Sequence, residues 1–233
     1  MPSRTTIHRA RKKRYIIAML VAIAAISFAL YNAAESNPYK NSKAWNFDTY
    51  QKDSILEGFS SMQTGIGDER TWIVKSDDSA PSKPNVLAKL SNNNNESSYH
   101  ILTMPDGIYS SNFKASLKFK ITSEEKRPAA VGLIVRFEDK KHYFVLAADA
   151  ENNRFSLCRA EPEKLICTQD RYVNITTGQW HSITAQVSAQ GIAGYLDEDL
   201  LIQRYDQHYM FGQIGLWAKG DSEAYFDNLK IDY

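Results

Sequence analysis

Six polar or aromatic residues interrupt apolar runs of the chain and are candidates for binding a ligand: Arg136, Tyr143, Arg154, Trp217, Lys219 and Asp221. A sugar site needs an exposed aromatic ring with several hydrogen-bonding groups around it, and these residue types supply both. Arg136 stands between two apolar neighbours, where an unpaired guanidinium would be costly to bury. It must therefore pair with a carboxylate or face a groove, while Trp217 is equally suited to the core.

Common catalytic motifs do not occur in the chain. There is no Gly-x-Ser-x-Gly sequence, no His-Glu-x-x-His pair and no Gly-Lys-Ser/Thr phosphate loop. The acidic runs at 124–125 and 197–199 have the wrong spacing for a catalytic array and fall in apparent turns. The histidines beyond the N-terminal region have no metal-ligand spacing: His100, His142, His181 and His208. We therefore expect a protein that is not an enzyme.

Calcium is a possible structural ligand, and no other cofactor is expected. Hard oxygen donors on loops bind this ion, and the candidates by residue type are Asp48, Asp197, Asp221 and Asp227. The alternative is that these carboxylates cap backbone groups, as Asp usually does at turns. The sequence leaves the metal undecided.

The two cysteines, Cys158 and Cys167, flank a turn marked by Pro162. If the chain folds back symmetrically about this turn, the two sulfur atoms face each other. An oxidising compartment would then allow a disulfide, worth about 2–3 kcal/mol for so short a loop. Two buried free thiols are the alternative, and two cysteines with no histidine nearby make a poor zinc site.

Residues 15–34 form an uncharged, mostly apolar run of twenty residues, preceded by six Lys or Arg residues and no acidic ones. A helix of that length spans the hydrocarbon layer of about 30 Å. The positive-inside rule places residues 1–14 in the cytoplasm as a basic tail and the remainder outside. We expect an uncleaved signal anchor in the lipid bilayer, with a cleaved signal peptide as the alternative.

The rest of the chain is acidic. Without the six N-terminal basic residues, 22 basic groups face 27 acidic ones, a net charge of −5 for residues 35–233. Nucleic-acid binding depends on Lys and Arg that neutralise phosphates. No nucleic-acid partner is therefore expected.

Short alternating segments dominate the region after a polar, Pro-containing linker at 35–44. In 112–121, for example, every second residue is apolar, as in a half-buried strand. Comparable segments are 130–137, 142–148, 154–159, 180–187, 191–197, 200–205, 213–218 and 224–231. No helical period of useful length occurs, so we predict one all-β domain over 45–233, a sandwich or barrel, with one or two short helical turns.

Six short motifs, in order along the chain, resemble one family: residues 132–137, 143–144, 178–181, 195–197, 212–217 and 225–229. They look like the concanavalin A-like lectin/glucanase superfamily, above all the laminin-G-like jelly rolls of bacterial secreted proteins and relatives of 3-keto-disaccharide hydrolases. The resemblance covers about 45–233. It implies a jelly-roll sandwich of two curved antiparallel sheets, with glycans or protein partners on the concave face or on loops at one edge.

The glucanases of this superfamily use a Glu-x-Asp-x-Glu array on one strand, which this chain lacks. We therefore expect a non-enzymatic, single-pass protein of the bacterial inner membrane. Its jelly roll, in the periplasm or outside the cell, would bind or cap subunits of a membrane complex or an envelope glycan. A carbohydrate-active hydrolase of the same fold is the alternative, supported by fold analogy alone.

Overall fold

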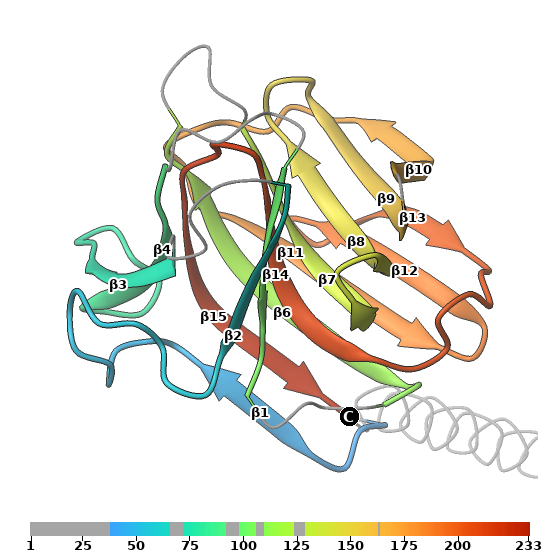
Figure 1. Ribbon diagram of the computed structural model, residues 1–233, viewed down its shortest axis with the longest axis horizontal. Coiled ribbons are helices and arrows are strands. Elements are labelled where there is room, and N and C mark those ends of the chain that lie inside the picture. Colours follow the sequence, from blue (N-terminus) through green and yellow to red (C-terminus); the bar gives the residue numbers. More distant parts are fainter. Residues whose placement is uncertain (1–37, 66–71, 92–97, 106–109, 124–128, 163) are drawn as a thin grey trace, which may run out of the picture. The chain divides into compact units, whose positions relative to one another are not determined.

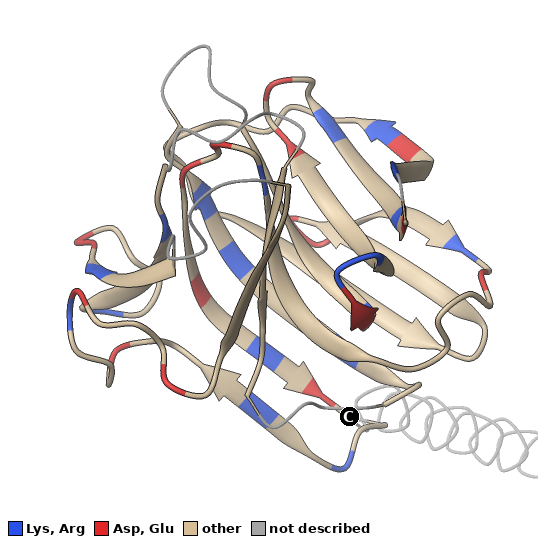
Figure 2. Ribbon diagram, viewed as in Figure 1, with Lys and Arg blue, Asp and Glu red and all other residues tan. Residues whose placement is uncertain are grey.

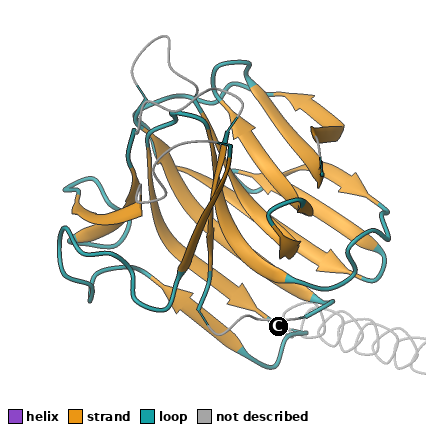
Figure 3. Cartoon of the chain, in the orientation of Figure 1, coloured by secondary structure: helices purple, strands orange, loops and turns teal. Residues whose placement is uncertain are grey.

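The computed structural model describes residues 38–65, 72–91, 98–105, 110–123, 129–162 and 164–233. The compact unit comprises Asn41–Tyr233. Its described part consists of strands and loops, without a helix (Figure 3). The expected helical turns are thus wrong for these residues; the segment that follows Asn46, for instance, forms plain turns.

Fifteen strands are described, and they form two sheets (Figure 1). The strands are β1 (Ser42–Trp45), β2 (Ser60–Thr64), β3 (Trp72–Ser76), β4 (Asn85–Lys89), β5 (Tyr99–Thr103), β6 (Phe113–Ile121), β7 (Ala130–Asp139), β8 (His142–Asp149), β9 (Arg154–Glu161), β10 (Lys164–Tyr172), β11 (His181–Ser188), β12 (Gly191–Leu196), β13 (Asp199–Arg204), β14 (Gln213–Lys219) and β15 (Ala224–Asp232).

Both sheets are antiparallel, which confirms the predicted all-β sandwich. Sheet A has the order β13-β12-β11-β6-β15-β4-β3, with β1 also paired to β15. Sheet B has the order β10-β9-β8-β7-β14-β5-β2. Sequence neighbours such as β5 and β6 thus lie in different sheets.

The main core lies between the sheets and follows from the alternation in the strands. In β6, Phe113, Ala115, Leu117, Phe119 and Ile121 are buried, as the period-two pattern predicts. Burial of large apolar side chains supplies most of the driving force for such a sandwich, at about 1.5–3 kcal/mol each.

The N-terminal boundary of the sandwich lies earlier than the sequence suggests. The strand β1 begins at Ser42, inside the expected linker at 35–44. The backbones of Asn41 and Tyr233 exchange two hydrogen bonds of 2.9 Å, which close the unit next to its C-terminus.

The expected membrane anchor at 15–34 and cytoplasmic tail at 1–14 lie outside the described residues. Across the ranges that the structure does describe, no helix has the length and apolar character needed to span a bilayer.

Candidate glycan-binding face

The outer face of sheet B is apolar, although it faces away from the main core. All residues of β7 from Ala130 to Phe137 are buried, so both faces of the strand are covered. The outward side chains of the central strands form a second apolar cluster, which contains Ile101, Ala130, Ile134, Phe137, Tyr143, Val145, Ala147, Cys158, Ala160 and Trp217. An outer face of this kind is unusual for an antiparallel sheet, which commonly leaves one polar face in water.

Sheet B is strongly curved around this face. Tyr99 of β5 and Leu165 of β10 line the same two hollows, although four strands separate them in the sheet order. A flat sheet would hold β5 and β10 roughly 24 Å apart, at about 4.8 Å for each step between strands. The outer face is therefore concave, and the β9–β10 hairpin bends toward β5.

The first hollow, which we call the lysine hollow, has a volume of about 570 Å³. Tyr143, Tyr99 and Leu165 belong to its apolar lining, and Thr64 lies at one side. Its charged lining residues are Lys140, Lys141, Glu161 and Lys164. They come from the ends of the β7–β8 and β9–β10 hairpins.

The second hollow, which we call the tryptophan hollow, has a volume of about 310 Å³ and shares Tyr99 and Leu165 with the first. Trp217 contributes an indole that stacks on Tyr99, with ring centroids 5.2 Å apart. Its other polar or sulfur-containing lining residues are Asp149, Asn152, Arg154, Ser156, Cys158, Cys167 and Lys219. Aromatic rings beside convergent polar groups are the composition expected of a sugar site.

Two buried polar groups on this face have no hydrogen-bond partner among the described residues: the Tyr143 hydroxyl and the Trp217 indole N–H. Burial raises the pKa of Tyr143, while the adjacent Trp217 N–H lowers it by less. The two groups are neighbours but do not meet with hydrogen-bond geometry. Leaving a buried polar group unpaired costs about 1–3 kcal/mol. Both groups are closed to solvent, so a ligand would reach them only where neighbouring side chains move aside.

A glycine lies at the centre of this face. Gly132 lies opposite Trp217 and Ala147 in the two neighbouring strands. A Cβ atom at Gly132 would approach Val145 Cγ2 to 2.6 Å, so no larger residue fits without a shift of the neighbouring strand. The close approach of β7 and β8 beneath this face therefore depends on a glycine in the middle of β7.

Arg154 forms part of the polar wall of the tryptophan hollow. Its Nη2 donates to the Tyr172 hydroxyl at 3.0 Å, and its guanidinium lies over the Tyr172 ring at 5.1 Å. Asp170 approaches Nη1 at 3.4 Å, whereas Nε has no partner among the described residues. On the neighbouring strand, Asp149 accepts from the backbone N–H and the side-chain amide of Asn152.

The disulfide lies at the same wall. Cys158 and Cys167 are opposite one another in β9 and β10 and are joined by a bond of 2.05 Å. The symmetrical fold-back about Pro162 is therefore present, and it links the edge strand β10 to the rest of sheet B.

Four of the six binding candidates from the sequence lie on the concave face: Tyr143, Arg154, Trp217 and Lys219. Two others do not. Asp221 lies near the Lys89 ammonium and accepts a short hydrogen bond from Ser91. Arg136 is fully buried, and its guanidinium donates to the backbone oxygens of Asp206 at 2.8 Å and Ser188 at 3.0 Å. It neither pairs with a carboxylate in a hydrogen bond nor faces the hollows.

Sequence reasoning missed Tyr99 and the lysines at 140, 141 and 164. Tyr99 begins a strand of only five residues, next to residues that look like a loop. The lysines occupy hairpin ends, where basic residues are ordinary. Only the pairing of distant strands shows that these four residues surround one hollow.

The calcium candidates do not form one site. Asp48 and Asp227 are close enough for their charges to repel, but Asp197 binds His181 and Asp221 lies near Lys89. No group of three or more His, Cys, Asp or Glu suited to a metal occurs among the residues that the structure covers.

Thr176, His181 and Asp197 form a hydrogen-bonded chain that resembles part of a nucleophilic triad. Nδ1 of His181 lies 2.6 Å from Asp197, and Nε2 lies 2.9 Å from the Thr176 hydroxyl. Nε2 also lies 3.1 Å from the Thr176 carbonyl oxygen, a group that can only accept a hydrogen bond. The Thr176 hydroxyl also donates to Gln179 at 3.2 Å, so these contacts tether the loop before β11.

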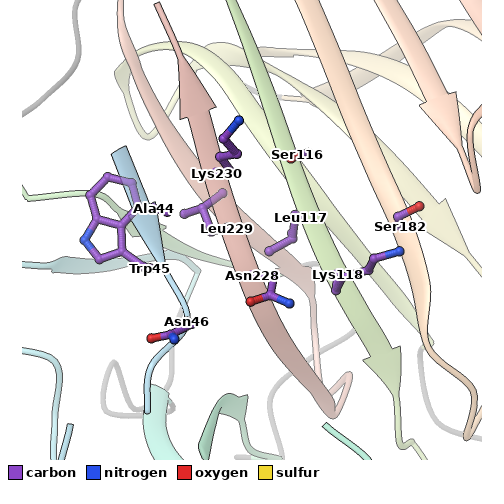
Figure 4. A pocket seen from close by; sticks show the side chains of 10 residues that line it. All are labelled: Ala44, Trp45, Asn46, Ser116, Leu117, Lys118, Ser182, Asn228, Leu229 and Lys230. Carbon is purple, nitrogen blue, oxygen red and sulfur yellow. The ribbon is translucent and has the colours of Figure 1, made fainter. Parts of the chain in front are cut away.

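Another hollow, of about 310 Å³, lies on the opposite sheet (Figure 4). Side chains from β1, β6, β11 and β15 surround it, including Trp45, Lys118 and Asn228. None of its lining residues carries a buried polar group without a partner, as far as the described residues show. The concave face of sheet B is therefore the stronger candidate.

No known protein-family model matches the chain, and no curated protein sequence matches it. Solved structures do share its architecture. They include the carbohydrate-binding module CBM66 from Bacillus subtilis, with 18% identity, a TM-score of 0.59, and coverage of 76% of this chain and 96% of that chain. Domain 4 of AbnA, a GH43 extracellular arabinanase from Geobacillus stearothermophilus, in complex with arabinotriose, has 14% identity, a TM-score of 0.56, and 83% and 93% coverage.

The carbohydrate recognition domain of Emp47p is a third example, with 10% identity, a TM-score of 0.51, and coverage of 82% of this chain and 94% of that chain. At these identities the likeness shows a common β-sandwich fold. It agrees with the resemblance to concanavalin A-like jelly rolls and does not transfer a ligand.

Proposed function

We propose that this protein binds a glycan on the concave face of sheet B and does not act on it chemically. The observation that carries the proposal is the concave face with two adjoining hollows, where Tyr99 stacks on Trp217 beside the polar groups of Arg154 and Lys219. Sugar hydroxyls both donate and accept hydrogen bonds, and sugar rings pack on aromatic faces. Carbohydrate-binding proteins among the structural neighbours support the choice of ligand.

The acidic residues of this face favour binding over hydrolysis. A glycosidase needs two carboxyl groups that flank one glycosidic bond. Asp149 and Glu161 lie in different hollows, and each already binds a neighbour, Asn152 and Arg159 respectively. Neither is presented as a free acid or nucleophile.

Presentation at a membrane is the second part of the proposal. The apolar run at 15–34, with its basic flank, would hold the sandwich at the outer face of a bacterial inner membrane. A site on sheet B would then reach envelope glycans, and the anchor would be free to contact other membrane subunits.

The test removes single polar atoms from the site. In Tyr143→Phe, the free protein loses a hydroxyl without a partner, so its free energy of unfolding should stay the same or rise by about 1 kcal/mol. Its affinity for the glycan should fall roughly five-fold, because the bound sugar loses one hydrogen bond of about 1 kcal/mol. A glycan array followed by calorimetry on the full-length protein measures the affinity, and urea unfolding measures the stability.

Trp72 provides a matched control for Trp217. Both indoles are buried and both N–H groups lack a partner, but Trp72 packs against Phe226 in the main core. We expect Trp217→Phe to weaken glycan binding and Trp72→Phe to leave it unchanged. The two variants should change the free energy of unfolding by similar amounts. Equal effects of the two variants would count against a site on sheet B. Glycan turnover that survives purification would favour the hydrolase alternative.

A further inference from the structure

The lysine hollow has an excess of positive charge. Lys140, Lys141 and Lys164 are exposed at its rim, and none of the three ammonium groups forms an ion pair with any described residue. Like charges that converge on one hollow repel each other and attract an anion. Figure 2 shows that the end of the β7–β8 hairpin carries basic residues directly beside acidic ones.

Two of the acidic groups near the hollow, among the residues that the structure describes, are already bound by other residues. Glu161 accepts a hydrogen bond of 2.6 Å from Arg159, which lowers the pKa of Glu161. Asp139 lies 2.9 Å from His142 Nδ1 and accepts from the backbone N–H of Lys141, and these contacts lower its pKa. Both carboxylates are therefore ionised at neutral pH but serve local partners, so the three ammonium groups keep their charge for a ligand.

This cluster does not follow from the overall composition. Residues 35–233 carry five more acidic than basic groups, and a general basic surface is therefore excluded. The rim lysines stand above an apolar lining that includes the partly exposed Tyr99 and Leu165, with the Tyr143 ring buried among them. Such a hollow matches a ligand with a ring and a negative group on the same unit.

We propose that the lysine hollow selects acidic sugars, with a carboxylate or sulfate at the rim lysines and the ring against Tyr99 and Leu165. The inference rests on the proposed function, because it names the glycan class of the same face. The tryptophan hollow, which contains Asp149 next to Arg154 and Lys219, would hold an adjoining sugar unit without the same demand for charge.

The experiment compares ligands that differ only in charge. Full-length protein in detergent is titrated with oligogalacturonates and their methyl esters, and with sulfated galactan oligosaccharides and their desulfated forms. We expect tighter binding of a charged form than of its neutral counterpart. The first pair tests a carboxylate and the second a sulfate, so the two sources of charge are separated.

A triple variant, Lys140→Gln with Lys141→Gln and Lys164→Gln, should lose roughly ten-fold in affinity for the acidic sugar, since each exposed charge contributes modestly. The matched control replaces three exposed lysines elsewhere, Lys52→Gln with Lys83→Gln and Lys114→Gln, and removes the same total charge. It should retain the affinity of the unmodified protein.

Three results would overturn the inference. Equal losses in the two triple variants would show general electrostatic attraction rather than a site. Charged and neutral sugars could instead bind with equal affinity, and this binding could be lost in Tyr143→Ala but kept in the triple variant of the rim lysines. That result would remove the acidic preference and leave the proposed function standing. Absence of binding to any glycan, charged or neutral, would remove both.

Discussion

Arg136 shows how a residue that looks functional in the sequence can serve the fold. It has a positive φ of 53°, in the irregular end of β7 where the register with β8 shifts. This backbone turns the guanidinium toward the carbonyl oxygens of Ser188, the last residue of β11, and Asp206, which follows β13; both strands belong to sheet A. One side chain therefore connects the two sheets at one end of the sandwich.

Replacement of this guanidinium should weaken that connection. In Arg136→Lys, one ammonium nitrogen replaces the two guanidinium nitrogens that reach separate carbonyl oxygens, so both hydrogen bonds cannot keep their geometry. We therefore expect a loss of about 1–3 kcal/mol in the free energy of unfolding. Urea denaturation measures it. Arg171→Lys, at an exposed residue whose guanidinium also donates to a carbonyl oxygen, is the control and should change stability by less than about 0.5 kcal/mol. Similar small losses in both variants would contradict the role of Arg136.

Asp227 should make stability depend on pH in an unusual direction. Burial raises its pKa from 3.8 to about 6, although the N–H groups of Ser82 and Asn228 lower it, and Asp48 adds repulsion. Because the pKa of Asp227 is higher in the folded state than in the unfolded state, its protonated form stabilises the fold. This contribution to the free energy of unfolding is complete below pH 3.8 and is lost as the pH rises through about 6.

Asp48→Asn isolates this effect. The new side chain can still accept from the Asn85 N–H and can donate to the Ser82 hydroxyl, so both hydrogen bonds of Asp48 have a replacement. With the neighbouring charge removed, the pKa of Asp227 should fall. We compare the free energy of unfolding of the variant with that of the unmodified protein. The difference should favour the variant by up to about 1 kcal/mol more at pH 7.5 than at pH 4.5. Urea unfolding at the two pH values tests this, and a gain of equal size at both would contradict it.

At the level of strands, the length and burial of each segment decided what could be predicted. The nine predicted segments correspond to β6–β9 and β11–β15, which have six to ten residues each; β6 and β11 alternate with a period of two, whereas β7 and β8 are continuous apolar runs. The short strands β1–β5 have four or five residues each and gave no clear period. The edge strand β10 is mostly half-exposed, so its two faces hardly differ in polarity.

The same limit applied to the site. Alternation places Tyr143 and Trp217 on one face of their own strands, but only the pairing of β7 with β8 and β14 brings them together. Tyr99 and the rim lysines depend on the curvature of the whole sheet, which no local pattern records. Hence the sequence indicated a glycan or protein surface and several of its residues, but not the hollows.

The β9–β10 hairpin is the element on which both hollows depend. It supplies Leu165, and its strand β10 pairs only with β9 among the described strands. Replacement of both cysteines by alanine should lower the free energy of unfolding by about 2–3 kcal/mol, the value for a loop of this length. It should also weaken glycan binding several-fold, because β10, which carries Leu165, is then held to β9 by the backbone ladder without the covalent link.

Calorimetry and urea unfolding of the double variant test this, with the unmodified protein in reductant as an independent way to open the disulfide. Both samples should show the same two losses. A double variant that is less stable but binds with unchanged affinity would mean that the disulfide does not shape the hollows.

In the molecule as a whole, the N-terminal region and the sandwich differ in charge. Six basic groups precede the apolar run at 15–34, and an acidic sandwich follows it. Full-length protein should therefore remain with the membrane fraction after alkaline carbonate extraction, and protease added from the outer side should reach the sandwich. A variant without residues 1–37 should be released.

That shortened variant is also the control for the binding site. The contacts of Asn41–Tyr233 form one compact unit, and the backbone pair between its first and last residues closes β1 against the C-terminal strand β15. The variant should therefore fold and bind glycan with the affinity of the full-length protein. Mature protein that begins after residue 34 would replace the anchor with a cleaved signal peptide. Loss of binding in a folded shortened variant would show that the ligand needs the membrane-proximal region as well as sheet B.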